Sequence, residues 1–224
     1  MRHWTRPALL RYTISALFQQ PARVSRSIRF LVKVLGVLRT MAAKGGERSL
    51  RQLFGDLVWR HFFADARLEE PQIANYVSGL LADFAHIDNL FRIRNSLGER
   101  LRDVGEMLIE SNLLLQASSF DRERTVRKHV GDYTLFMTGL FPEAVARVRQ
   151  TKRPQLDAFI DFVSIGKESY AIVASFDQFE YHDEASLFRR LAENFELCVF
   201  GLNLVKQDLQ EFQREYDRLK KILG

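Results

Sequence analysis

Apolar side chains recur three and four positions apart along most of the chain, beginning near Ser49. This spacing gathers them on one face of an α-helix, whereas a half-buried strand would alternate apolar and polar residues. No window shows a convincing alternation, and no motif repeats at a period of about 20 to 50 residues. We therefore predict an all-α fold, a single bundle of about six to seven helices formed by residues 47–224.

Capping residues, prolines and glycines set the expected helix boundaries. Ser96 and Glu99 form a capping-box pattern at the start of the third expected helix, and Ser118 or Ser119 is the expected N-cap of the fourth. The first five helices are expected at about 49–63, 71–86, 96–115, 119–140 and 155–179. Several of the glycines inside the helices are expected to permit close helix crossings, because each is otherwise unfavourable in a helix; the candidates are Gly55, Gly79, Gly105, Gly131, Gly139, Gly166 and Gly201.

The strongest pattern lies at the C-terminal end, where residues 184–224 predict one long helix. Its apolar seam alternates spacings of three and four without a skip, at Phe188, Leu191, Phe195, Cys198, Leu202, Val205, Leu209, Phe212, Tyr216, Leu219 and Leu223. The seam from Phe188 to Leu223 covers 36 residues, or roughly 54 Å of helix at 1.5 Å per residue. A domain of this size is only about 35–40 Å across. Two interpretations follow. Aromatic residues on the seam favour a helix packed wholly within its own bundle; the alternative is that the charged end, 207–221, overhangs and binds a partner.

Residues 1–46 form a basic leader. Eight of the 33 basic residues and none of the 28 acidic residues lie in 1–40, so 41–224 carry a net charge of −3. Apolar residues among these bases predict a basic amphipathic helix; they are Ile28, Leu31, Val32, Leu35 and Leu38. Four interpretations stay open: residues 7–44 bind an anionic membrane surface, the leader is a cleaved targeting peptide, Met41 is the native start, or the leader packs on the domain. Its longest apolar run is far short of the roughly 20 residues of a spanning helix.

The single cysteine, Cys198, excludes an intramolecular disulfide and a multi-cysteine metal site. This favours a cytoplasmic location, membrane-peripheral if the leader binds lipid. Cys198 falls on the apolar seam and is expected to be a small buried hydrophobe. The 18 phenylalanines predict an aromatic-rich core.

Two carboxylate–histidine pairs have helical i, i+3 spacing, Asp83 with His86 and His129 with Asp132. Two such pairs on facing helices could hold a metal ion in a bundle core. The Glu-x-x-His motif of diiron bundles is absent, so the alternative is ordinary side-chain hydrogen bonding.

The segment from Arg124 to His129 resembles the Arg-x4-His motif of HEPN-type ribonucleases, which are also small helical bundles. The resemblance implies that Arg124 stabilises developing phosphate charge while His129 moves a proton. Asp132 is the third catalytic candidate. No motif for a cofactor, a phosphate loop or a nucleophile elbow occurs. The basic residues of 47–224 form small clusters mixed with acidic ones, so there is no specific nucleic-acid signal.

The most distinctive string, HVGDYTLFMTGLFP at 129–142, resembles a motif of uncharacterised bacterial all-helical proteins. The resemblance spans about 120–180 and implies no activity. Gly131 and Gly139 would let a neighbouring helix approach closely, and Asp132 and Tyr133 would supply polar contacts beside the core.

The leading hypothesis is a non-enzymatic interaction or scaffold protein that self-associates, or binds another protein, through its C-terminal helix. Two alternatives stay open. One is a HEPN-like ribonuclease or metal-binding enzyme centred on His129, and the other is a peripheral membrane protein docked by residues 7–44. The sequence does not decide whether the protein is an enzyme.

Overall fold

The computed structural model describes residues 47–101, 104–112, 119–147 and 155–223, and their regular structure is helical. The all-α class is confirmed. Within these ranges the strand-type pairing is one isolated bridge between Arg94 and Arg100. None of the helices described combines the length and apolarity needed to span a bilayer. The predicted leader, 1–46, lies outside the described residues.

Nine α-helices occur in these ranges, more than the six to seven predicted. The difference arises because two short connecting segments are helical and the last helix is divided. The order is α2 (Glu47–Arg60), the π-helical segment η2 (His61–Asp65), α3 (Pro71–Phe84), α4 (Ile87–Leu90), α5 (Val104–Glu110), α6 (Phe120–Leu140), α7 (Pro142–Arg147), α8 (Gln155–Ser175), the 3-10 segment η3 (Phe179–Tyr181), α9 (His182–Glu193) and α10 (Phe195–Leu223).

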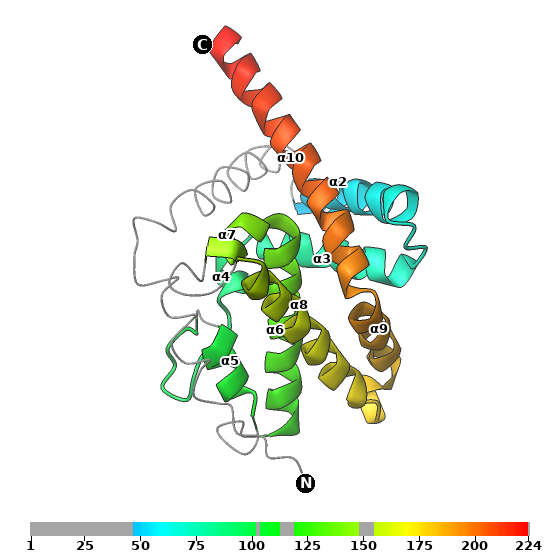
Figure 1. Cartoon of the computed structure of the whole chain (residues 1–224), viewed down its shortest axis with the longest axis vertical. Helices are drawn as coiled ribbons and strands as arrows, with labels where there is room; N and C mark the ends of the chain where they lie inside the picture. Colours follow the sequence, from blue (N-terminus) through cyan, green and yellow to red (C-terminus); the bar gives the residue numbers. More distant parts are fainter. Residues whose placement is uncertain (1–46, 102–103, 113–118, 148–154, 224) are drawn as a thin grey trace.

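Helix α6 occupies the centre of the described structure. It packs against α8 and α10, while α8 packs against α9 and α2 against α3 (Figure 1). Residues on every side of α6 are buried, which is the pattern of a core helix. Its buried Thr134 and Thr138 hydroxyls donate to the carbonyls of Val130 and Thr134, so these polar groups are satisfied within the helix itself.

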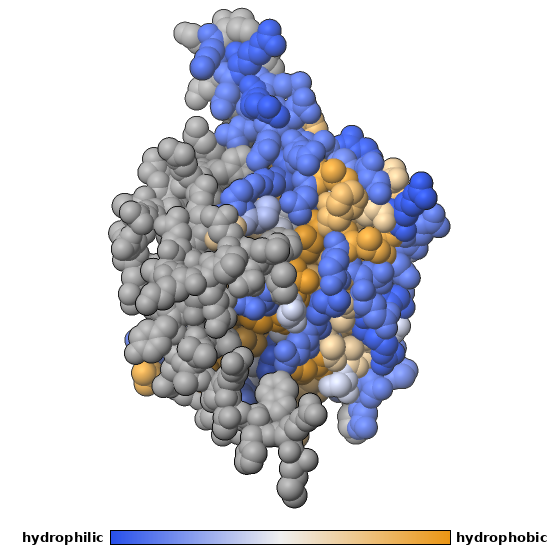
Figure 2. Space-filling model, viewed as in Figure 1, coloured by the Kyte–Doolittle hydropathy of each residue, from blue (hydrophilic) through white to orange (hydrophobic). Residues whose placement is uncertain are grey.

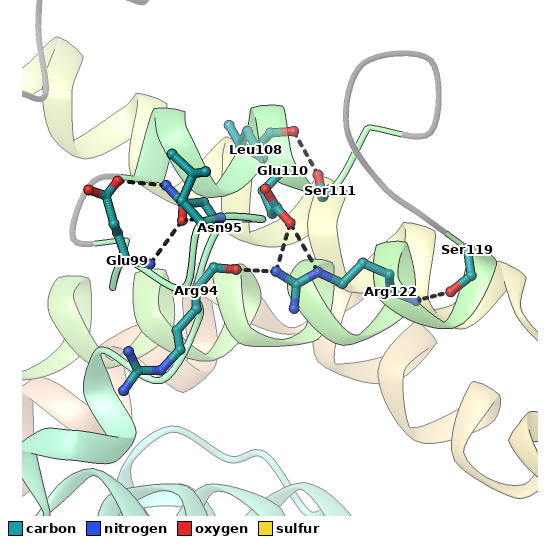
Figure 3. Close-up of polar contacts among 9 residues, drawn as sticks. Arg94, Asn95, Glu99, Leu108, Glu110, Ser111, Ser119 and Arg122 are labelled. Atoms are coloured by element: carbon teal, nitrogen blue, oxygen red, sulfur yellow. Dashed lines mark hydrogen bonds and ion pairs between the residues drawn. The ribbon is translucent and has the colours of Figure 1, made fainter.

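The start of α6 was predicted correctly. The Ser119 side-chain oxygen accepts a hydrogen bond from the Arg122 backbone N–H at 3.1 Å, as an N-cap does (Figure 3). The Arg122 guanidinium also donates to Glu110 at 2.8 Å and to the Arg94 carbonyl. These contacts tie the first turn of α6 to α5 and to the turn that precedes it.

The predicted helix start at Ser96 was wrong, because 95–99 form a tight turn and α5 begins only at Val104. The Asn95 side-chain oxygen accepts from the backbone N–H of Glu99 (Figure 3). It also accepts from the backbone N–H of Leu97. Gly98 has a φ of +80°, which glycine adopts at no steric cost. Asparagine at a turn offers the backbone an alternative to the helix, and here that alternative prevails over the capping box.

The prediction of one helix over 184–224 was also wrong. Helix α9 ends at Glu193 and α10 begins at Phe195, with Asn194 between them. The Asn194 side chain and backbone N–H both donate to the Arg190 carbonyl, which closes the end of α9. Leu191 and Phe195 are nevertheless both buried. The apolar spacing continues across the break and therefore does not reveal it.

Four of the glycines sit at close helix crossings, as predicted. A Cβ on Gly131 would lie 2.5 Å from the Tyr170 ring. Equivalent clashes involve Leu202 at Gly139, Phe195 at Gly166 and Phe62 at Gly201. Gly55 and Gly79, in contrast, have no atom within 4 Å of a Cβ position.

Gly131→Ala should therefore lower the free energy of unfolding by about 1–3 kcal/mol, because the new methyl group must displace the buried Tyr170 ring. Gly79→Ala is the matched control and should raise that free energy by about 0.5–1 kcal/mol, since alanine is the better helix former where space is open. Urea denaturation measures both changes. Equal changes in the free energy of unfolding would contradict the close approach of Tyr170 to Gly131.

Candidate functional site

A buried carboxylate lies at the crossing of three helices. Gly131 lets the Tyr170 ring of α8 rest against α6, and the Tyr170 hydroxyl donates to Asp132 Oδ1 at 2.9 Å. The Tyr76 hydroxyl of α3 donates to the same oxygen at 2.5 Å. Asp132 is 3 % exposed. One carboxylate oxygen thus joins α3, α6 and α8.

Two cations approach this carboxylate from the surface. Arg92 Nη2 lies 3.9 Å from Asp132 Oδ2, with its side chain 45 % exposed. The Lys128 ammonium, one turn before Asp132, lies 5.5 Å from the Tyr76 ring centroid and 5.3 Å from that of Phe188. Such positions over aromatic faces are favourable for a cation.

Burial raises the pKa of the Asp132 carboxyl, and the Tyr76 hydrogen bond, Lys128, Tyr170 and Arg92 oppose this shift. Burial and the neighbouring carboxylate raise the pKa of both tyrosine hydroxyls well above the ordinary value. The two tyrosines therefore stay protonated and act as hydrogen-bond donors. Their hydrogen bonds favour the charged carboxylate, but burial outweighs them, so the pKa of Asp132 is raised overall.

Arg124 contacts the beginning of α9. Its Nη2 donates to Glu184 at 2.6 Å, and its guanidinium carbon lies 3.9 Å from the Tyr181 ring centroid. The hydrogen bond from Arg124 lowers the pKa of the Glu184 carboxyl. Arg124 itself is 7 % exposed. These contacts join the first half of α6 to α9.

His129 is fully buried, and its Nε2 lies 3.2 Å from the Leu90 carbonyl oxygen. That acceptor assigns the proton to Nε2 in the neutral ring. Nδ1 has no hydrogen-bond partner among the described residues. Burial, with the charge of Arg92, lowers the pKa of the imidazole to about 3, against the opposing Leu90 bond. His129 is therefore neutral at physiological pH.

The predicted catalytic residues have separate partners. Arg124 and His129 are five residues apart, so they point about 140° apart around α6. Arg124 reaches Glu184 on α9, while His129 reaches Leu90 at the end of α4. The residues that share a face with Arg124 are Lys128 and Asp132, at intervals of four. The arrangement does not bring a phosphate-stabilising arginine and a proton-transferring histidine to one point.

The four metal candidates are also divided. Asp83 is exposed and paired with Arg51 at 2.9 Å, and the exposed His86 lies beyond the end of α3. His129 and Asp132 are buried with partners of their own. Over the described ranges, no group of three or more His, Cys, Asp or Glu side chains could hold a metal ion. Cys198 is buried as predicted, and burial raises the pKa of its thiol.

Sequence reasoning missed the partners of Asp132. Helical spacing groups Tyr76 and Tyr170 with the apolar core residues, and Arg92 and Lys128 belong to the small clusters in which basic and acidic residues are mixed. A signal was present, because an aspartate inside the apolar string 129–142 must be hydrogen-bonded once buried. Which donors it meets depends on helix crossings that periodicity does not encode.

Comparison of the chain with protein families, curated proteins and solved structures found no match. The interpretation of this cluster therefore depends on its geometry. Asp132 and Arg124 both bond to side chains of neighbouring helices, which indicates a structural role in joining α3, α6, α8 and α9.

Tyr170→Phe and Tyr76→Phe should each lower the free energy of unfolding by about 1.5–3 kcal/mol, because each removes a donor from a buried carboxylate. Tyr181→Phe is the control, since its hydroxyl also donates to an aspartate, Asp121, but in solvent. It should change stability by less than about 0.5 kcal/mol. Thermal or urea unfolding gives the free energy of unfolding of the three variants. A similar decrease in all three would refute the prediction that the buried hydrogen bonds contribute more than the exposed one.

His129 should make the fold sensitive to acid. The unfolded chain takes up a proton near the ordinary pKa of 6.5, whereas the folded chain does so only near 3. The stability from the neutral ring is thus fully present above pH 6.5 and is lost as the pH falls toward 3. Between pH 7 and 5 the parent should lose about 2 kcal/mol relative to His129→Leu. Replacing the exposed His86 by Leu is the control; a parent and His129→Leu with parallel pH profiles would contradict the assignment.

Proposed function

We propose that the protein is a non-enzymatic interaction module that self-associates through the projecting end of α10, residues 210–223. The observation that carries this proposal is the burial pattern of α10. Phe195, Cys198, Leu202, Val205 and Leu209 are buried one after another along the seam, and the next seam residue, Phe212, is exposed. The helix continues to Leu223 and leaves the body of the molecule (Figure 1). The projecting end is about four turns, or about 21 Å, long.

Contacts on two sides hold α10 where it leaves the body. The Lys206 ammonium donates to Glu143 of α7 at 2.5 Å. Asp208 accepts from Arg60 and lies 2.8 Å from His61 Nε2, at the junction of α2 and η2. The projecting end therefore starts from a fixed base, which reduces the entropy lost when a partner binds it.

The seam continues onto the projecting end. Phe212 follows the buried Leu209 by three residues and is 42 % exposed. The sequence keeps the alternating spacing as far as Leu223. A helix of four turns is marginal alone in water, and pairing of two seams supplies the apolar burial that stabilises it.

Steric and charge arguments favour an antiparallel second copy as the partner. The body of each copy lies on the seam side of α10 up to Leu209. A parallel partner would bring its own body to the same level and side, where the two would overlap. An antiparallel partner places its body beyond Leu223. It also sets 207–213, with two acidic and no basic residues, beside 218–223, with three basic and no acidic residues.

Phe212→Glu should weaken self-association by at least about tenfold, because each copy loses one buried phenylalanine from the interface. Phe120→Glu is the control, since Phe120 is 68 % exposed at the start of α6, away from the seam. Sedimentation equilibrium over a range of concentrations gives the dissociation constants.

A second pair of variants tests whether the two α10 helices are antiparallel. Glu211→Arg should weaken the dimer, and adding Arg218→Glu should restore it if the helices are antiparallel. A parent that stays monomeric at all concentrations, or a Phe212→Glu protein with the parent's dissociation constant, would exclude the proposal.

A further inference from the structure

A second apolar surface lies on α10, on the side turned away from the seam. We call Leu197, Phe200 and Leu204 the outer stripe. Their spacing of three and four places them on one face of the helix. Leu197 is 41 % and Phe200 49 % exposed, and Leu204 is half-buried. Figure 2 shows apolar atoms gathered below the point where α10 leaves the body.

The surroundings of the outer stripe are acidic. Glu193 at the end of α9 and Glu196 and Glu211 on α10 are all exposed. The Lys167 ammonium of α8 lies 2.7 Å from Glu196 Oε1. This surface is therefore an apolar strip beside three carboxylates, of which Glu196 is already paired with Lys167. It differs from the projecting end, whose last turns are basic.

The chemistry of the surface selects among three occupants. An anionic membrane would meet the carboxylates with like charge. The outer stripe of a second copy would bring a second set of the same carboxylates. A basic amphipathic segment satisfies both features, because its apolar residues cover the stripe while its cations face the carboxylates.

This chain contains such a segment. Residues 26–39 carry Arg26, Arg29, Lys33 and Arg39 and no acidic residue, and apolar residues recur among them mostly three and four apart. The connection is short enough for docking within one chain. Residue 46 directly precedes α2, which is about 20 Å long and contacts α10 at its far end, where Arg60 pairs with Asp208. The residues between 39 and 47 reach about 26 Å when extended, at about 3.3 Å per residue.

We propose that residues 26–39 dock on the outer stripe of α10 in the same chain, with the leader's cations beside Glu193, Glu196 and Glu211. This contact is separate from self-association, because the seam and the outer stripe lie on different sides of α10. It also engages the bases that an anionic lipid surface would bind, so docking and lipid binding compete for one segment.

Limited trypsin digestion of the full chain tests the docking, because the leader's arginines and lysine are cleavage sites. Peptide masses give the rate at 23–39 separately from cleavage within 47–223, which monitors folding. In Leu197→Glu/Phe200→Glu, cleavage at 23–39 should be at least about tenfold faster than in the parent, since two apolar contacts are lost. Raising the salt to about 0.5 M should also speed cleavage of the parent, through screening of the charges.

The control is Phe212→Glu, which should weaken self-association and leave cleavage at 23–39 unchanged. The two proposals can thus fail independently. Diluting the parent tenfold should not alter the rate, because the segment and the stripe belong to one chain. Equal cleavage rates at 23–39 in the parent and in Leu197→Glu/Phe200→Glu would overturn the proposal.

Discussion

A single buried carboxylate organises the centre of this fold. Asp132 is removed from water at the point where α3, α6 and α8 meet, and an ionised carboxylate in such a place is costly unless donors surround it. Tyr76 and Tyr170 provide these donors from two different helices. The contact works only because Gly131 has no side chain where the Tyr170 ring lies. The neighbouring residues Gly131 and Asp132 therefore act together on Tyr170. Gly131 leaves space for its ring, and Asp132 accepts the hydrogen bond from its hydroxyl.

The charged residues of α6 extend this role toward the surface. Arg124 bonds to Glu184 of α9 and lies against Tyr181, and Lys128 lies over the Tyr76 and Phe188 rings. Each cation thus holds α6 to a neighbour and counters a nearby acidic charge. His129 remains neutral beside them, because burial and Arg92 both disfavour its protonation. Arg124, His129 and Asp132 are the catalytic candidates of the sequence. In the structure each of them contacts a residue of a neighbouring helix.

Helix α10 presents three chemically different surfaces. Its seam is apolar and buried as far as Leu209, and the next seam residue, Phe212, is exposed to solvent. Its projecting end has acidic and basic segments in succession, a distribution that suits a reversed second copy. Its outer stripe lies near the exposed carboxylates Glu193, Glu196 and Glu211, which suits a basic segment. The direction of α10 away from the body, fixed by Lys206 and Asp208, keeps the projecting end free of the rest of the chain described by the structure.

The sequence by itself determined the helical class, the start of α6 at Ser118 or Ser119, the burial of Cys198 and the close helix approach at Gly131 and Gly139. These features depend on spacing along one helix or on residue size, which are local properties. Only the structure revealed that Asn194 divides the C-terminal helix and that Asn95 replaces the Ser96 cap with a turn, because asparagine side chains offer the backbone local hydrogen bonds that compete with the helix. It also decided that Asp132 meets Tyr76 and Tyr170 and that Arg124 and His129 have different partners. Those contacts join residues 38 to 60 positions apart, and helical periodicity gives the face of a residue but not the helix that it meets.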